Sequence, residues 1–140
     1  MGNKASKPGN LRFIRYDILT LIWIFVIMGL TFTPGPNIPP LPHWELISFD
    51  TFVHAVIFAT LVFLSANAFK RLKENSLLKR HPFVFSFVLS FFFGCLIEII
   101  QPYIPGRTFD YYDILSNSIG AIIGIFAVFT RSYFFSSSGI

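Results

Sequence analysis

Eight polar residues that could bind a charged group or move a proton lie at the ends of long apolar stretches. They are Asp50, His54, Glu98, Gln101, Arg107, Asp110, Asp113 and Asn117. Residues three or four positions apart share one face of a helix, and three pairs have this spacing: Asp50 with His54, Glu98 with Gln101, and Asp113 with Asn117. We interpret the eight residues as a candidate ligand-binding site assembled from three helices.

Proton transfer is one chemistry that this set could perform. A histidine with a carboxylate one helical turn away can act as an oriented general base, which fits His54 beside Asp50. A carboxyl group in an apolar setting can serve as an acid, which fits Glu98. No nucleophile motif such as G-x-S-x-G accompanies them. The catalytic candidates are His54, Glu98 and Asp113, and the residues leave open whether any reaction occurs.

Arg107 is the one permanent cation near these residues in the sequence. Its planar guanidinium can bind a carboxylate or a phosphate through two parallel hydrogen bonds. Glu98 follows an apolar run, and a carboxylate near the hydrocarbon boundary usually faces a partner or a wet cavity. We therefore expect Arg107 to pair with Glu98 or to hold an anionic group of a ligand.

A metal ion is another use for the same side chains. His54, Glu98, Asp110 and Asp113 could offer nitrogen and oxygen ligands to a hard cation. The sequence contains neither H-E-x-x-H nor paired Cys and His residues at zinc-binding spacing. We therefore predict no metal and no cofactor.

Each residue also has a purely structural explanation. Asp50 and Asp113 precede apolar helices and can cap their N-termini, for about 0.5–2 kcal/mol each. Arg107 can simply neutralise a neighbouring carboxylate, and Asn117 can join two helices at about 0.6 kcal/mol. For the whole set on one membrane face this explanation is weaker, because ionisable groups at a membrane edge indicate function by default.

Four apolar segments must position these residues, at 18–33, 51–69, 83–100 and 114–135. The chain is 54% hydrophobic and 13% charged, against about 25% charged in a soluble domain, which excludes a soluble enzyme or a nucleic-acid-binding module. Backbone inside lipid must satisfy its own hydrogen bonds, which favours helices. We predict an all-α fold, a four-transmembrane-helix bundle at 17–135, with tails at 1–16 and 136–140.

Two further features concern how the helices pack. Gly120 and Gly124 form a G-x-x-x-G stripe that allows a neighbouring helix to approach closely. The stripe lies on roughly the same side as Asn117, so that Asn117 and Asp113 are expected to face the other helices. Cys95 is the only cysteine, which excludes an intramolecular disulfide.

The basic residues indicate how the bundle is oriented. Ten of the eleven lysines and arginines fall in the two ends of the chain and in the 70–80 loop, and Arg107 alone lies on the other side. Lys and Arg are retained in the cytoplasm, so both termini are predicted to be cytoplasmic. The first segment is followed by no A-x-A-like cleavage site and is expected to be a retained anchor. The net charge of +4 indicates topology and attraction to membrane lipids, not a nucleic-acid partner.

The stretch 98–124 resembles the VanZ-like family of small bacterial membrane proteins in the order and spacing of its polar residues and glycines. The family's E-x-x-Q, G-R, D-x-x-x-N and G-x-x-x-G elements have counterparts here in Glu98-Ile-Ile-Gln101, Gly106-Arg107, Asp113-Ile-Leu-Ser-Asn117 and Gly120-Ala-Ile-Ile-Gly124. Asp50-Thr-Phe-Val-His54 is similar to its D-K-x-x-H element. Thr51 replaces the usual lysine, and Phe58 stands where a tyrosine is common, so roles that need that charge or hydroxyl do not carry over.

The resemblance implies a setting more than a reaction. The family is named for a protein associated with resistance to teicoplanin, a glycopeptide that targets cell-wall precursors, which implies the envelope and the bacterial cytoplasmic (inner) membrane. Two hypotheses follow. The polar site binds or modifies a lipid-linked or wall-related ligand, with a link to glycopeptide-type antibiotic resistance. Alternatively, the protein is a non-enzymatic accessory subunit that docks against a larger membrane protein complex.

Overall fold

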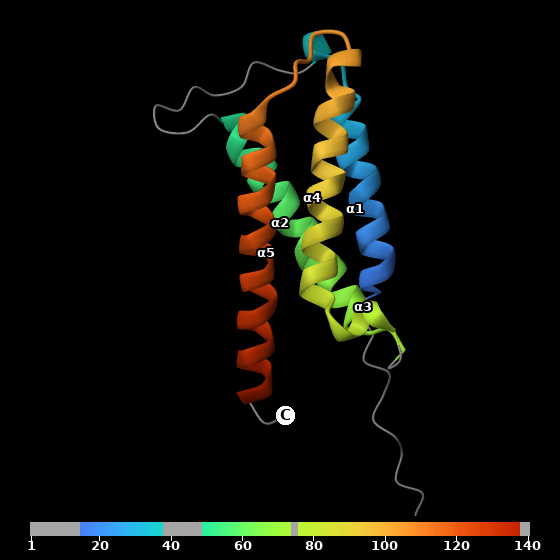
Figure 1. Ribbon diagram of the computed structural model, residues 1–140, viewed down its shortest axis with the longest axis vertical. Helices are drawn as coiled ribbons and strands as arrows, with labels where there is room; N and C mark the ends of the chain where they lie inside the picture. Colours follow the sequence, from blue (N-terminus) through green and yellow to red (C-terminus); the bar gives the residue numbers. More distant parts are fainter. Residues whose placement is uncertain (1–14, 38–48, 74–75, 138–140) are drawn as a thin grey trace, which may run out of the picture.

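A computed structural model describes residues 15–37, 49–73 and 76–137, and this part of the chain is helical with no strand. The long elements are α1 (Tyr16–Thr31), α2 (Phe49–Phe69), α4 (Pro82–Ile100) and α5 (Tyr111–Ser137). Short elements join them: η1 (Gly35–Asn37), α3 (Leu77–Arg80) and η2 (Gln101–Tyr103). Figure 1 shows α1, α4 and α5 running roughly along one axis, with α2 crossing obliquely among them. The predicted all-α fold is confirmed.

Three of the four long helices are long and apolar enough to cross a membrane: α2, α4 and α5. The first, α1, is apolar but has 16 residues, which at about 1.5 Å per residue gives roughly 24 Å, less than the roughly 30 Å of hydrocarbon. The protein is therefore a membrane protein with three helices of spanning length and one shorter apolar helix. A fourth crossing by α1 stays a prediction.

The central helix is α2, which packs against α1, α4 and α5. Its buried face contributes Phe58 and Leu61 to a core that they share with Ile27 of α1 and Ile97 of α4. The indole of Trp23 donates a hydrogen bond to the Ile57 carbonyl at 3.0 Å, which ties α1 to the middle of α2. Helices from distant parts of the sequence thus meet on one element.

The contact between α2 and α5 is unusually close because α5 presents glycines to it. A side chain at Gly120 would overlap the carbonyl oxygen of Ala55, and one at Gly124 would overlap that of Ala59. One helical turn earlier, the Ser116 hydroxyl donates to the carbonyl oxygen of Thr51. The backbone-to-backbone approach continues to the start of both helices, where it brings the polar residues of α2 and α5 together.

The bundle has two chemically different ends. We call one the acidic end, which holds Asp50, Glu98, Asp113 and Arg107, and the other the basic end, which holds Lys70, Arg71 and Arg131. The described chain begins with α1 at the basic end and finishes with α5 at the same end (Figure 1). Residues 1–14, most of the proline-rich loop (38–48), positions 74–75 and the last residues (138–140) lie outside the described ranges. The predicted tails, domain limits and orientation stay predictions.

Candidate functional site

His54 lies at the centre of the acidic end. Its Nδ1 is 3.1 Å from the side-chain oxygen of Asn117, and since an amide oxygen cannot donate, Nδ1 carries the hydrogen. The other ring nitrogen, Nε2, lies 3.7 Å from an oxygen of Asp113 and 4.0 Å from an oxygen of Asp50. The glycine contact between α2 and α5 sets this geometry, because it seats His54 directly against the first turns of α5.

Burial differs sharply among the groups that surround the imidazole. The side chains of Asp113 and His54 are 9% and 14% exposed, whereas that of Asp50 is 43% exposed. Asn117, whose side-chain oxygen accepts the hydrogen bond from Nδ1 on the other side of the ring, is 2% exposed. Nε2 therefore faces one buried and one half-exposed carboxylate. The cluster is accessible on the side of Asp50 and buried on the side of α5.

Glu98 is fully buried at the end of α4. One of its carboxylate oxygens accepts a long hydrogen bond, 3.4 Å, from the backbone N–H of Asp110. The other oxygen has no hydrogen-bond partner among the described residues, and neither has the amide nitrogen of Asn117. Buried polar groups are almost always hydrogen-bonded, so each of these atoms needs a specific explanation.

Arg107 does not form the expected pair with Glu98: no ion pair joins them in the described ranges. Its guanidinium donates instead to the carbonyl oxygens of Leu30, at 3.2 Å, and Thr33, at 3.4 Å, at the end of α1. The last carbonyl groups of a helix have no partner within the helix, and a cation there interacts favourably with the helix dipole. Arg107 is turned toward α1 by the loop that carries it.

That loop is a tight turn from Ile104 to Arg107. The N–H of Arg107 donates to the Ile104 carbonyl at 3.1 Å, with Gly106 at a φ of +75°, as a type II turn with proline before glycine requires. The N–H of Gly35 donates to the Pro105 carbonyl at 2.9 Å, so the segment after α1 packs onto the turn. Pro105-Gly106 is a recognisable sequence signal for this turn, whereas nothing in the sequence indicates its contact with Gly35.

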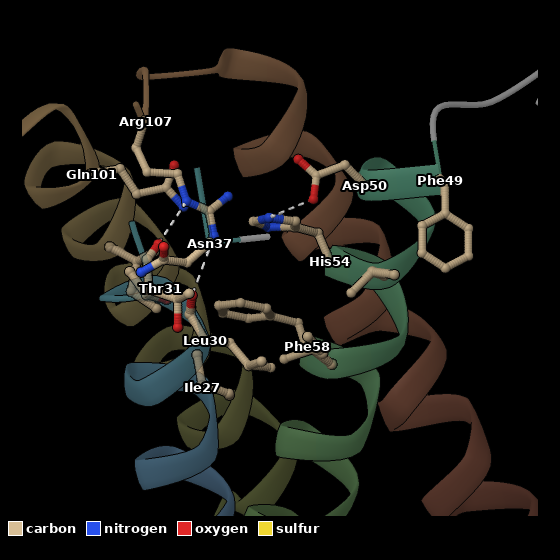
Figure 2. A pocket seen from close by; sticks show the side chains of 14 residues that line it. Ile27, Leu30, Thr31, Asn37, Phe49, Asp50, His54, Phe58, Gln101 and Arg107 are labelled. Carbon is tan, nitrogen blue, oxygen red and sulfur yellow. Dashed lines mark hydrogen bonds and ion pairs between the residues drawn. The ribbon is translucent and has the colours of Figure 1, made fainter. Parts of the chain in front are cut away.

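A cavity of about 330 Å³ opens between α1, α2 and α4 at this end. Its polar side chains include four of the eight predicted site residues, namely Asp50, His54, Gln101 and Arg107. Figure 2 shows Arg107 and Gln101 on one side, His54 with Asp50 on the other, and Phe58 beneath the imidazole. Apolar side chains of Ile27, Leu30 and Ile97 also line it. An apolar pocket with a few converging polar groups is typical of a small-molecule site.

The remaining predicted residues surround this cavity or point elsewhere. Asp113, Asn117 and Glu98 are buried at the acidic end but do not line the cavity. Asp110 is exposed, and its carboxylate accepts the N–H of Tyr112 at 2.7 Å, a local contact just before α5. The sequence pattern missed the apolar residues that α1 contributes, because nothing in an apolar run distinguishes a cavity wall from a lipid-facing position.

Three side chains could hold a metal ion. Asp50, His54 and Asp113 each offer one ligand atom, and these atoms all lie within 4.8 Å of one another. Spacing in the sequence joins only the first two, since Asp113 reaches them through the packing of α5 on α2.

A second cavity, of about 550 Å³, lies between α1, α2 and α4 toward the basic end. Its lining is almost entirely apolar apart from Asp17, Thr20 and three serines, and Asp17 is paired with Arg15 at 2.9 Å. The hydroxyls of Ser86 and Ser90 have no hydrogen-bond partner among the described residues. These groups are neutral, so their burial costs less than that of a carboxylate.

Comparison with known proteins gives a family but no close relative. A protein-family model described as VanZ/LLP1 matches residues 18–132, which is most of the chain. No curated protein and no solved structure matches. The family resemblance stated from the polar motifs is confirmed.

Proposed function

The chain belongs to the VanZ/LLP1 family, and from this premise we propose that it binds an amphiphilic ligand of the cell envelope at the acidic end. The ligand has an anionic head group and an apolar chain, as lipid-linked or wall-related molecules do. In this proposal the acidic end faces outward from the bacterial cytoplasmic membrane, with both termini inside, as the distribution of basic residues indicates.

One observation carries the proposal: a guanidinium and an imidazole face each other across a single cavity with apolar walls (Figure 2). A guanidinium group has five N–H donors. Arg107 uses two of them on the carbonyl oxygens of Leu30 and Thr33, at and just after the end of α1, which leaves others for an anion. The apolar walls formed by Ile27, Leu30 and Ile97 suit a hydrocarbon chain. His54, whose Nε2 lies beside the carboxylates of Asp113 and Asp50, is the candidate for proton transfer should the ligand be modified.

Binding of a wall precursor would also give the protein a route to glycopeptide-type resistance, because those antibiotics act on such precursors. The accessory-subunit alternative needs a free docking surface. The Gly120/Gly124 stripe that the sequence offered for close helix contact is occupied by α2 of the same chain. An accessory-subunit interface would therefore have to lie on an outer helix face.

The test is mass spectrometry of the tagged protein purified in native-lipid particles. We expect a bound phosphate-containing amphiphile that Arg107→Ala loses. Because Arg107 also contacts the end of α1, a second variant enlarges a side chain in the cavity wall while keeping Arg107 and its backbone acceptors: Leu30→Trp, at a cavity-lining position that is 51% exposed. Ile22→Trp, on the same helix, 53% exposed and outside the cavity, is its matched control.

The proposal predicts loss of the amphiphile in Arg107→Ala and Leu30→Trp and its retention in Ile22→Trp. Equal retention in all three proteins contradicts it. Stoichiometric protein companions in place of an amphiphile would favour the accessory-subunit alternative.

A further inference from the structure

Three donor atoms at the acidic end converge on one point. His54 Nε2 lies 3.7 Å from Asp113 Oδ2 and 4.0 Å from Asp50 Oδ1, and the three ligand atoms of this group lie within 4.8 Å of one another. Zinc binds nitrogen and oxygen at about 2.0–2.2 Å, which places two ligands of a tetrahedral ion roughly 3.4 Å apart. The pair of His54 and Asp113 is already close to this separation, and the half-exposed Asp50 side chain would have to move closer to complete the group.

The state of the imidazole fits a metal ligand. Its Nδ1–H donates to the side-chain oxygen of Asn117, so that Nε2 is the ring nitrogen left to face the two carboxylates. A metal-binding histidine characteristically donates its other ring N–H to an oxygen acceptor in this way. Asn117 is buried and cannot easily exchange this contact for water.

Glu98 gives an independent indication that something is missing at this end. It is fully buried, one of its oxygens has no hydrogen-bond partner in the described chain, and its carboxylate is close enough to interact electrostatically with Asp113 and His54. A buried carboxylate without a partner is costly. An ion beside it, or a donor group carried by that ion, would provide one.

The charge balance points in the same direction. Within the described ranges, no lysine or arginine forms an ion pair with Asp50, Glu98 or Asp113, and the nearby Arg107 is turned to the end of α1. Several carboxylates therefore gather around a single imidazole with no permanent cation between them. A divalent cation held among them would offset this charge.

We infer that Asp50, His54 and Asp113 bind a divalent transition-metal ion, and that Asn117 orients the imidazole of His54 for this role. The mixed nitrogen and oxygen ligands favour zinc or manganese over calcium and magnesium, which prefer oxygen ligands alone. Three protein ligands leave coordination positions open, as in catalytic sites. The inference deepens the proposed function, because two of the ligands line the cavity beside Arg107, where such an ion would bind a phosphate oxygen of the head group. It replaces the expectation from sequence that no metal binds.

The test uses the metal alone. The full chain, purified with a tag that contains no histidine, is stripped with a chelator and titrated with Zn²⁺ and with Mn²⁺ by calorimetry, and the metal content before stripping is measured by elemental mass spectrometry. We expect a single ion per chain. His54→Gln and Asp113→Asn are expected to abolish saturable binding, and Asn117→Leu to weaken it about 10–100-fold.

Two controls separate this site from adventitious binding. Asp17→Asn removes an exposed carboxylate and His81→Gln removes a histidine, both at the basic end and outside the three-residue group. Both should bind like the unaltered protein. Asp50→Asn removes a half-exposed ligand with little risk to folding, and it should weaken binding even if Asp113→Asn fails to fold. Binding that is absent, or that falls equally in Asp50→Asn and Asp17→Asn, overturns the inference.

The outcomes also separate this inference from the proposed function. Metal binding without any bound amphiphile removes the proposed ligand but keeps the ion. An amphiphile that depends on Arg107, in a protein that binds neither Zn²⁺ nor Mn²⁺, removes the ion but keeps the ligand.

Discussion

The two ends of the bundle use charged residues in opposite ways. At the basic end, arginine and lysine side chains contact polar and aromatic groups of neighbouring helices: Arg131 donates to the hydroxyl of Tyr16, Lys70 donates to Ser132 at 2.8 Å, and Arg71 lies 4.6 Å above the Tyr16 ring. At the acidic end, carboxylates crowd around His54, and one oxygen of Glu98 has no hydrogen-bond partner among the described residues.

The difference separates a structural arrangement from a functional one. Contacts at the basic end tie α1, α2 and α5 together. Contacts at the acidic end are geometrically fixed but chemically incomplete. Binding energy is available where polar groups are held in place without being satisfied, so a ligand is expected there.

The largest expected effect comes from breaking the contact that builds the acidic end. Gly120→Val places a branched side chain against the carbonyl oxygen of Ala55, and we expect a loss of about 3 kcal/mol or more in unfolding free energy, with loss of ligand and metal binding. Gly29→Ala is the matched control, because nothing lies within 4 Å of that position. It should be neutral or stabilise α1 by roughly 0.5–1 kcal/mol. Thermal unfolding measures both, and equal midpoints would contradict the packing argument.

Glu98→Gln tests whether the buried carboxylate lowers the stability of the protein while it contributes to binding. The amide has nearly the same shape without the buried charge, so the ligand-free protein is expected to be as stable as before or about 1 kcal/mol more stable. Binding of the inferred metal ion should nevertheless weaken, because the amide lacks the negative charge that Glu98 offers beside it. Asp17→Asn, at an exposed carboxylate of the basic end, is expected to change neither quantity. A destabilised Glu98→Gln that still binds fully would show that Glu98 is a structural residue.

Tyr16→Phe tests the opposite prediction at the basic end. The substitution removes the hydroxyl that accepts from Arg131, and we expect a loss of about 1 kcal/mol in stability. Ligand and metal binding at the far end should stay unchanged. Tyr112→Phe, at an exposed ring, is the control and should affect neither quantity. Loss of binding in Tyr16→Phe would mean that the two ends are coupled.

The smallest effect concerns pH. Partial burial, and after it the charge of Arg131, lower the pKa of Lys70. The unfolded chain therefore holds this proton more tightly than the folded one, so the contribution of Lys70 to stability rises as the pH increases toward its ordinary value of 10.5. Lys70→Gln should flatten the rise in unfolding curves measured between neutral and alkaline pH. An unchanged slope would show that Lys70 is not desolvated.

Sequence patterns predicted much of the fold. The four apolar segments and the all-helical class follow from composition and length, and the spacing of Asp50 and His54 gave their common helix face. The polar motifs identified the family. The length of α1 was not predictable in this way. Its apolar stretch resembles the other three in the sequence, but the helix has only 16 residues and is too short for a clear membrane span.

The partner of Arg107 could not be predicted, for a physical reason. An arginine in a loop can reach any acceptor within several ångströms, and the turn at Gly106, together with its contact to Gly35, decides the direction. The convergence of Asp113 on His54 likewise depends on how deeply two helices approach. Gly120 and Gly124 indicated a close helix contact, but the sequence did not show which helix would face them.

The most direct test of the account is whether residues of α2 and α5 meet at the acidic end as described. Cysteines introduced at His54 and Asn117, in a Cys95→Ser background, are treated in native membranes with a short bifunctional thiol reagent. The account predicts rapid crosslinking of this pair and none between cysteines at His54 and Arg131, which lie at opposite ends of the bundle. Persistent failure of the 54–117 pair, with both cysteines shown to be reactive, would contradict the account and remove the site.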